Sequence, residues 1–352
     1  MKRLLSRNTR RQTLTYAAVA AAFLIIQLLG GMGALSSSLK GMLVPICAYV
    51  VMAISLNLTV GILGELSLGH AGFMSVGAFT GVTCAIILQD IVPFAPLRLT
   101  ISMVVGALFA AAVGFLIGIP VLRLNGDYLA IVTLAFGEII KSFFNNLFLG
   151  VDGKGLHMSL ISDNTHLEEG HSLIIGGPMG IGGIQKISTF TAGFILILLA
   201  LFVVFNLVGS RSGRAIMAVR DNRIAAESVG INITQYKLMA FVTSAAMAGA
   251  AGTLFAMNYS TFTANKFDFN TSILVLVFVV LGGLGNMFGS IVAAAALTIL
   301  PEALRQFSDY RMLVYAIVLI LVMLVTNNPA IKNFLARPFA RLVREKGGSV
   351  HE

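Results

Sequence analysis

The segment RSGRAIMAVRDNRIAAESVGINITQYK, residues 211–237, is a long basic polar stretch between strongly apolar parts of the chain. An arginine at the centre of a bilayer costs about 2.5–3.5 kcal/mol, so its four arginines exclude the segment from lipid. Good helix formers over 215–229, with Asp221 as a cap between two short turns and Gly230 as a stop, predict a short helix. The segment therefore lies in water, as a surface helix with one apolar face.

Composition places the remainder of the chain in a membrane. Of the 352 residues, 57% are hydrophobic and only 11% are charged, far from the average of soluble proteins. The net charge of +9 comes from basic residues at the ends of apolar runs, where they orient helices and meet anionic lipid headgroups. We therefore expect an all-α polytopic membrane protein that contacts membrane lipid and binds no nucleic acid.

The apolar runs predict eight to ten membrane spans. The run over 271–283 is shorter than the roughly 20 residues that a span needs, so we expect it to be half of a broken pair hinged at residues 282–285. The first run is too long for the apolar core of a typical signal peptide and is expected to be retained. The runs cover about 14–35, 42–63, 66–88, 99–122, 128–149, 189–208, 238–257, 271–283, 288–304 and 312–326.

Basic residues predict the orientation of these spans. In a ten-span arrangement with the N-terminus inside, most basic residues fall in inside segments, as the positive-inside rule requires. Both termini are then cytoplasmic. The expected domain plan is a basic N-terminus over 1–13, a transmembrane domain over 14–327 and a basic tail over 328–352. The transmembrane domain contains one outside loop, 150–188, and one inside loop, 211–237.

Motifs for independent chemistry are missing from the sequence. There is no G-x-x-x-x-G-K-[ST] phosphate-binding loop, so active transport would need ATP hydrolysed by a partner. HExxH and GxSxG are also missing, which disfavours an intramembrane enzyme. Cys47 and Cys84 lie in apolar runs without metal-ligand spacing, so neither a metal nor any cofactor is expected.

A second informative stretch, LNLTVGILGELSLGHAGFMSVGAFTG at 56–81, combines glycines with polar residues. Frequent glycines in membrane helices indicate either close helix packing or a break that lines a cavity. Polar side chains inside the membrane are functional candidates by default, although a solvated turn is the alternative for the charged and titratable ones. The candidates for the translocation pathway here are Asn57, Glu65, Ser67 and His70.

A third stretch, LRLNGDYLAIVTLAFGEIIKSFFNN at 122–146, places Glu138 and Lys141 three residues apart on one helix face. Such a pair within an apolar run is costly unless its members neutralise each other or meet water. We interpret both as further pathway candidates, with an ion pair that only orients the helix as the alternative.

Several stretches together carry a family resemblance. Ala225, Ala226 and Gly230 resemble the glutamate-alanine-alanine loop of ABC-importer permeases, with Ile224 in place of the leading glutamate. The following LMAFVTSAAMAGAAGTLFA at 238–256, GGPMGIGGI at 176–184 and VVLGGLGNMFGS at 279–290 are similar to branched-chain amino acid permeases of the LivM type. The similarity extends over roughly 40–325, and the segment 147–175 is longer than is usual in the family.

The resemblance implies a subunit of an ABC importer in the cell membrane, for leucine, isoleucine and valine. Implied partners are a second homologous permease, two cytoplasmic ATPases that use ATP, and an extracytoplasmic solute-binding protein. A urea or short-amide permease of the same family is one alternative, and an ion-coupled secondary transporter with Glu138 and Lys141 as a proton relay is another. The implied ATPase-coupling residues are Arg220, Arg223, Ala225, Ala226, Glu227 and Gly230, and those on the binding-protein side are Gly177, Pro178 and Gly180.

Overall fold

The computed structural model describes residues 2–32, 36–89, 91–124, 126–152, 155–160 and 173–304, together with positions 313, 316, 317 and 320. The chain forms two compact units, 1–295 and 296–352. Most of the described residues belong to the first unit, and the second contributes the end of one helix. Most of the predicted span 312–326 and all of the predicted tail 328–352 lie outside the described residues.

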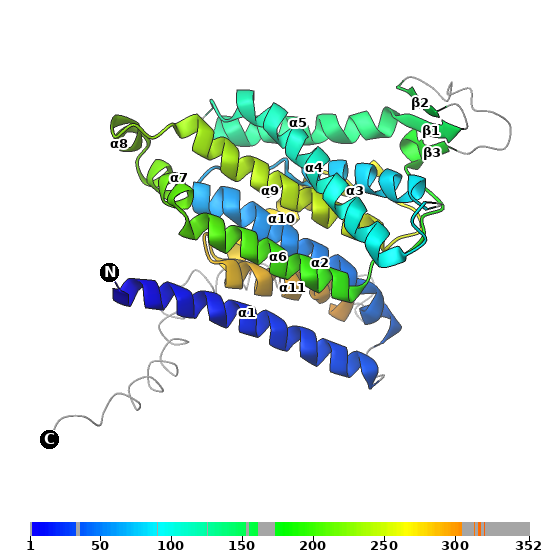
Figure 1. Ribbon diagram of the computed structural model, residues 1–352, viewed down its shortest axis with the longest axis horizontal. Helices are drawn as coiled ribbons and strands as arrows, with labels where there is room; N and C mark the ends of the chain where they lie inside the picture. Colours follow the sequence, from blue (N-terminus) through cyan, green and yellow to red (C-terminus); the bar gives the residue numbers. More distant parts are fainter. Residues whose placement is uncertain are drawn as a thin grey trace. The chain divides into compact units, whose positions relative to one another are not determined.

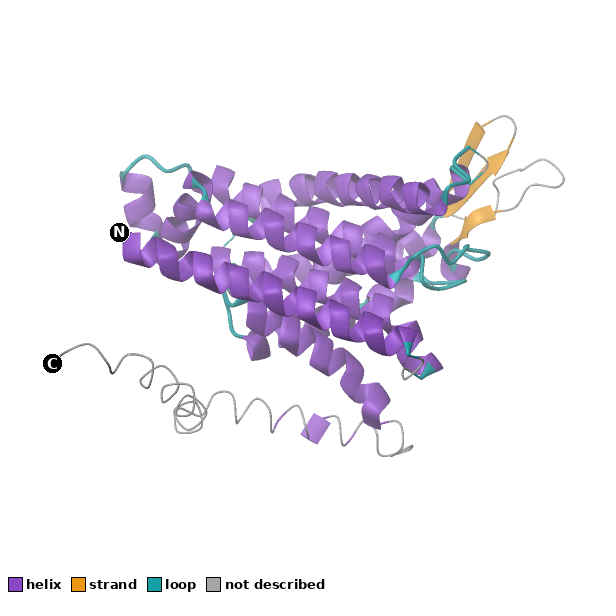
Figure 2. Ribbon diagram, turned by 60° about the horizontal axis from the view of Figure 1, so that its bottom comes forward, coloured by secondary structure: helices purple, strands orange, loops and turns teal. Residues whose placement is uncertain are grey.

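The first unit is a bundle of long helices with a small sheet at one end (Figures 1 and 2). The α-helices are α1 Lys2–Gly31, α2 Ser37–Asn57, α3 His70–Ile87, α4 Ala95–Val121, α5 Asp127–Asn146, α6 Phe190–Gly209, α7 Arg211–Asp221, α8 Arg223–Ser228, α9 Ile233–Ala256, α10 Phe269–Gly282 and α11 Met287–Ala303. Shorter elements are the π-helical turn η1 Leu58–Leu63, the 3-10 turns η2 Gly177–Met179 and η3 Ala264–Phe267, and the strands β1 Phe148–Asp152, β2 Gly155–Ser159 and β3 Leu173–Gly176.

Six helices in the described part of the chain are long and apolar enough to cross a membrane: α1, α2 continued by η1, α3, α4, α6 and α9. Helix α5 has 20 residues but carries Glu138 and Lys141, and α10 and α11 are shorter apolar helices. The prediction of a polytopic helical membrane protein is confirmed. The predicted count of eight to ten also included α5, the short helices α10 and α11, and the run 312–326. Of these, 271–283 was expected to be half of a broken pair, which agrees with the short length of α10, and most of 312–326 lies outside the described residues.

Close contacts between glycines hold α3, α4 and α9 together. A Cβ atom built on Gly77 would lie 2.0 Å from the carbonyl oxygen of Gly249, and one on Gly249 would lie 2.6 Å from that of Gly106. The hydroxyl of Thr253 donates to the carbonyl of Gly77 over 2.7 Å. Small residues let membrane helices approach to backbone contact. The interpretation of the glycines in 56–81 as close-packing residues is confirmed at Gly77.

Two glycine-rich turns interrupt the helices. Helix α2 passes into η1, which ends at Gly64 with φ 80°. Helices α10 and α11 are separated by a turn in which Gly283 and Gly285 have φ values of 92° and 78°. Glycine adopts such left-handed conformations without the steric cost that other residues meet. The predicted break at 282–285 is confirmed.

The sheet and the α7–α8 pair lie at opposite ends of the bundle, and α1 begins at the α7–α8 end (Figure 1). The sheet has the order β2-β1-β3, with both pairs antiparallel and Phe148 opposite Ser159 and Gly176. Strands β2 and β3 and most of β1 fall within the predicted outside loop 150–188, for which no strands were predicted. Leu149 and Ile175 are buried, and their apolar side chains anchor the strands against the bundle.

Candidate functional site

Helices α7 and α8 form a two-helix element between α6 and α9. The Ser210 hydroxyl caps α7 by accepting from the Gly213 N–H over 3.1 Å, and the Asn222 side chain caps α8 by accepting from the Ala225 N–H over 3.0 Å. The predicted division into two turns is confirmed. The cap is Asn222 and not Asp221, since the carboxylate of Asp221 accepts from Arg220 instead.

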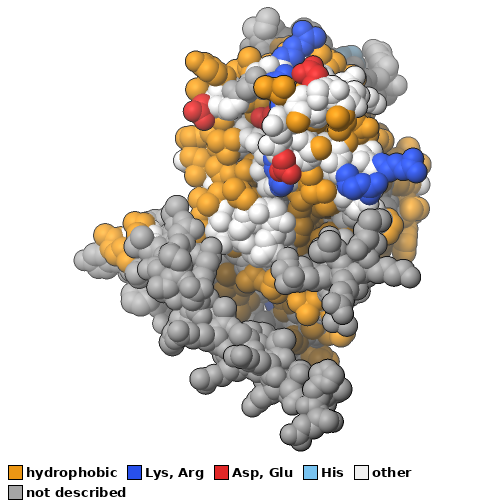
Figure 3. Space-filling view, turned by 90° about the vertical axis from the view of Figure 1, so that its left-hand side faces the viewer, with side chains coloured by type: hydrophobic (Ala, Val, Ile, Leu, Met, Phe, Trp, Pro, Cys, Tyr) orange, Lys and Arg blue, Asp and Glu red, His pale blue; other side chains and the backbone are white. Residues whose placement is uncertain are grey.

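The short helix α8 exposes an apolar pair of side chains. Ile224 and Val229 are 81% and 74% exposed, whereas Ala226 is 4% exposed and packs against Val219 and Ile233. Gly230, with φ 84°, turns the chain from α8 toward α9. Figure 3 views this end of the molecule, where charged side chains stand among apolar ones. The exposed apolar surface of this element is therefore centred on Ile224 and Val229, and Ala226 supports it from within.

Arg220 points toward the membrane bundle and not away from it. Its Nη1 donates to the carbonyl of Gly61 in η1 over 3.2 Å, while Nε and Nη2 donate to the carboxylate of Asp221 over 3.0 and 2.8 Å. The resemblance implied that Arg220 contacts an ATPase. The described contacts of Arg220 join α7 to η1, the turn that continues α2.

Glu65 forms an ion pair with Lys237 of α9, and the side chains are 15% and 4% exposed. The segment 211–237 was predicted to lie in water, but the side chain of its last residue, Lys237, is buried. A buried charge needs a partner, so the pair neutralises both groups where the loop before α3 meets α9. No local pattern indicated this pairing, because the two residues are 172 positions apart.

Asn57, Ser67 and His70 lie inside the bundle, each at most 1% exposed. The ring Nε2 of His70 is 2.6 Å from the Ser55 hydroxyl and 3.2 Å from that of Ser244 on α9. Asn57 donates to the Ser290 hydroxyl and accepts from the Gly285 N–H, both over 2.8 Å. In this structure Asn57 and His70 join helices that are distant in the sequence.

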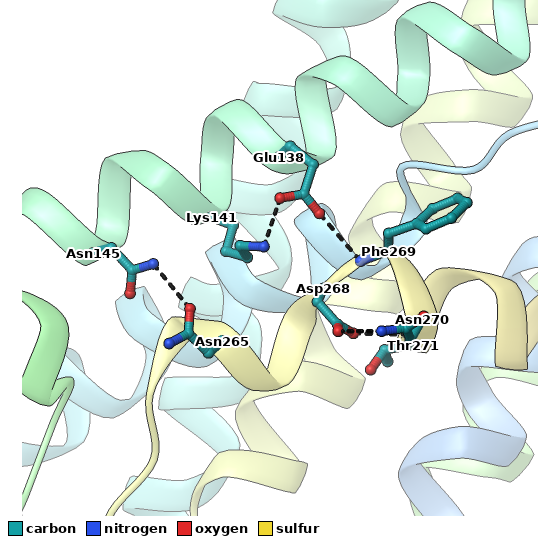
Figure 4. Close-up of polar contacts among 8 residues, drawn as sticks. All are labelled: Glu138, Lys141, Asn145, Asn265, Asp268, Phe269, Asn270 and Thr271. Carbon is teal, nitrogen blue, oxygen red and sulfur yellow. Dashed lines mark hydrogen bonds and ion pairs between the residues drawn. The ribbon is translucent and has the colours of Figure 1, made fainter.

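Glu138 and Lys141 of α5 form the predicted ion pair, with 2.6 Å between Oε2 and Nζ. Glu138 also accepts from the backbone N–H of Phe269 over 3.2 Å, and Lys141 interacts electrostatically with Asp268 (Figure 4). One turn further along, the amide of Asn145 donates to Asn265 over 3.0 Å. We call the group Glu138, Lys141, Asn145, Asn265 and Asp268 the α5–α10 polar face.

The α5–α10 polar face remains partly open, since the side chains of Glu138 and Lys141 are 41% and 23% exposed. Ionisable groups at membrane depth face protein or a water-filled cavity and not lipid tails. The exposed part of this face is therefore polar and is not suited to contact with lipid tails.

Replacement of Glu138 by glutamine tests this ion pair. We expect Glu138→Gln to lower the stability of the assembled protein by about 1 kcal/mol, because both groups are partly exposed and solvent screens the pair. The double variant Glu138→Gln, Lys141→Met should recover part of this loss. The check is the thermal midpoint of the detergent-solubilised protein. Equal midpoints for wild type and the single variant would show that the pair contributes nothing to stability.

Gly177, Pro178 and Gly180 lie at the sheet end of the bundle. The Gly177 N–H donates to the Leu147 carbonyl over 2.9 Å, and a Cβ atom on Gly180 would lie 2.0 Å from the Phe262 carbonyl oxygen. Close packing against the loop after α9 therefore requires glycine at position 180. These three residues directly follow β3, and the sheet lies at the opposite end of the bundle from α8 (Figure 1).

Residues 38–323 match the family described as "Branched-chain amino acid transport system / permease component". This chain belongs to that family. The permease is 37% identical over 286 residues to the high-affinity branched-chain amino acid transport system permease protein LivM of Salmonella typhimurium, and 35% identical over 310 residues to LivM of Escherichia coli. Each alignment covers 78% of this permease and 66% of the relative, so the chain spans slightly less than two thirds of their length.

More distant relatives carry other names. The ribose import permease protein RbsC of Escherichia coli is 26% identical over 289 residues, which covers 79% of the permease and 81% of RbsC. No solved structure matches the chain. The family and the apolar helices together identify the permease as a multi-pass protein of the cell membrane and a transport subunit.

An apolar groove of about 730 Å³ lies between α3, α4 and α5 of the permease. Among the described residues that line it, none is charged, so it offers no counter-ion to an ionised solute. No group of three or more His, Cys, Asp or Glu residues able to hold a metal ion occurs in the part of the chain that the structure describes. The charged sites of interest are therefore the α5–α10 polar face and the α7–α8 element. Residues that line the groove include Phe79, Thr83, Phe109, Ile140, Phe144 and Leu149.

Proposed function

We propose that the permease is a membrane subunit of an ABC importer for branched-chain amino acids, driven by ATP that partner ATPases hydrolyse. The observation that carries the proposal is the α7–α8 element, which presents Ile224 and Val229 to water on a short capped helix. Exposed apolar side chains with a polar surround are typical of protein interaction sites. The similarity to the branched-chain amino acid permeases LivM of Salmonella typhimurium and Escherichia coli supports branched-chain amino acids as the solutes.

The proposed assembly contains a second homologous permease, two ATPases and a solute-binding protein. We place the α7–α8 end in the cytoplasm, where ATP is available, and the sheet end with Gly177, Pro178 and Gly180 outside, where a binding protein would dock. Both termini are then cytoplasmic, as the distribution of basic residues favours.

The α5–α10 polar face is proposed to line the translocation path beside the second permease. Its charges of both signs suit a zwitterionic solute, and lipid could not cover them without a large cost. The buried contacts of Asn57 and His70 favour a role in helix packing over direct contact with the solute.

Reconstitution tests the function and its alternatives. The complete complex in proteoliposomes should import leucine when ATP is supplied and should not respond to a proton gradient. Uptake of urea but not leucine would favour the short-amide alternative. Uptake that persists without ATP and collapses with the proton gradient would favour the ion-coupled transporter.

A substitution at the exposed apolar pair tests ATPase docking. Ile224→Asp should weaken co-purification with the ATPases by about tenfold or more, because a charge replaces a central apolar contact. Met179→Asp is the matched control, since Met179 is equally exposed, at 82%, but lies at the sheet end. Membrane insertion should be normal in both variants. Normal co-purification of Ile224→Asp would move the docking surface away from α8.

A further inference from the structure

Three segments that are far apart in the sequence meet where Arg220 reaches η1. Arg220 lies in the last turn of α7, Gly61 lies within the π-helical turn η1, and Gly285 lies in the turn between α10 and α11. A Cβ atom built on Gly61 would lie 2.2 Å from the Gly285 backbone nitrogen, and the Gly61 carbonyl accepts from Arg220. Gly61 is therefore in backbone contact with the α10–α11 turn while it is hydrogen-bonded to α7.

We propose that Arg220 and the turn Gly61–Gly64 form a rigid link that transmits displacement of α7–α8 to the α10–α11 turn. The inference deepens the proposed function, on which it rests: Arg220 is a positioning residue that joins the ATPase docking element to the transmembrane part. A rigid link requires that η1 contacts both α7 and the α10–α11 turn closely enough that neither neighbour can slide along it.

On the α7 side, Arg220 can contact the turn closely because Gly64 has no side chain. Gly64 has φ 80°, and a Cβ atom there would lie 2.5 Å from Cγ of Arg220. The aliphatic part of Arg220 therefore lies directly over this turn, and Asp221 holds the other edge of the guanidinium. A planar guanidinium that is bonded along two edges keeps one orientation, which an ammonium group could not do.

On the far side, the side chain of Asn57 fastens the α10–α11 turn. It is fully buried, accepts from the Gly285 N–H and donates to the Ser290 hydroxyl at the start of α11. A buried amide with both ends bonded is costly to displace, because its polar atoms would lose their partners. The turn between α10 and α11 is thus tied to the helix end that Arg220 contacts.

The element at the far end of the link, the α10–α11 turn, is one that can change conformation. Single π-helical turns often occur at functional sites, and the α10–α11 turn has two glycines with positive φ. The other end of α10 donates from Phe269 to Glu138. Displacement of α7–α8 would therefore reach α10, and through it the α5–α10 polar face.

A reversible cross-link tests whether the link is rigid. A Cβ atom at position 64 would lie 3.6 Å from Cβ of Arg220, within the range that a disulfide needs. The experiment places Gly64→Cys and Arg220→Cys together in a permease with Cys47→Ser and Cys84→Ser. The complete complex, with ATPases and binding protein, is assayed in proteoliposomes for leucine uptake and leucine-stimulated ATP hydrolysis.

We expect the reduced double variant to lose uptake by about tenfold or more while it still co-purifies with the ATPases, because the contact with η1 is broken. Oxidation should restore most of the uptake, and a reductant should abolish it again. A merely structural role would not give recovery that follows the redox state. Low uptake in a confirmed disulfide-linked protein would overturn the proposal, since it would mean that α7 must move relative to η1.

A second variant covers the case in which the disulfide does not form. Arg220→Gln should lose coupled ATP hydrolysis by about tenfold while retaining the ATPases, because the charge-assisted contact to Gly61 is gone. Arg123→Gln, which removes an exposed arginine from the loop between α4 and α5, is the matched control. Full coupling in Arg220→Gln overturns the link. Failure of the unmodified complex to bind ATPases or to import leucine refutes the proposed function instead.

Discussion

Replacing Gly77 with alanine is expected to prevent stable packing of α3 against α9. The added Cβ atom would lie 2.0 Å from the Gly249 carbonyl oxygen and 2.3 Å from its Cα, positions that no rotamer change can relieve. The two helices would have to separate, which also breaks the hydrogen bond from Thr253 to the Gly77 carbonyl. We expect a loss of about 3 kcal/mol or more, at the upper end of the range for overpacked cores.

The measurement is the thermal midpoint of the detergent-solubilised protein, followed by size-exclusion chromatography. Gly41→Ala is the matched control, because Gly41 is also helical and a Cβ atom there has no neighbour within 4 Å. The control should be unchanged or slightly stabilised, as alanine favours helix more than glycine does. A Gly77→Ala protein with the thermal midpoint of the wild type would contradict the close backbone contact between α3 and α9.

Replacing Lys237 with methionine is expected to destabilise the protein more than any change at the Glu138–Lys141 pair. Lys237 is nearly fully buried, and its loss leaves the carboxylate of Glu65 without its partner. Removal of one member of a buried ion pair costs about 3–5 kcal/mol. The half-exposed pair on α5 is screened by solvent and should cost less.

The double variant Glu65→Gln, Lys237→Met should recover most of this loss, since no uncompensated charge remains. Lys186→Met, at an exposed position, provides the control for removal of a lysine. Thermal midpoints of the wild type, Glu65→Gln, Lys237→Met and the double variant form a double-mutant cycle. Additive effects of the two single changes would mean that Glu65 and Lys237 do not interact.

Several features could be predicted from the sequence because they depend on local composition. The membrane class follows from the apolar content, the water-exposed element from the arginines of 211–237, and the break between α10 and α11 from the glycines at 282–285. The Glu138–Lys141 pair was also predictable, since helix geometry alone places residues three positions apart on one face.

Other features depend on which helices become neighbours and how each is rotated. The sequence marked Lys237 and Arg220 as basic residues in a water-exposed segment, but α9 carries Lys237 inward to Glu65 and α7 aims Arg220 at Gly61. Ala226 likewise packs against Val219 and Ile233, which no local pattern indicated.

Composition by itself therefore determined that this chain is a helical membrane protein with a water-exposed basic segment, because hydropathy and charge act on each segment separately. Only the tertiary structure decided which polar groups are paired with each other and which are exposed on the surface. Those choices depend on contacts between residues as far apart as Asn57 and Gly285, whose geometry is set when the helices pack and not before.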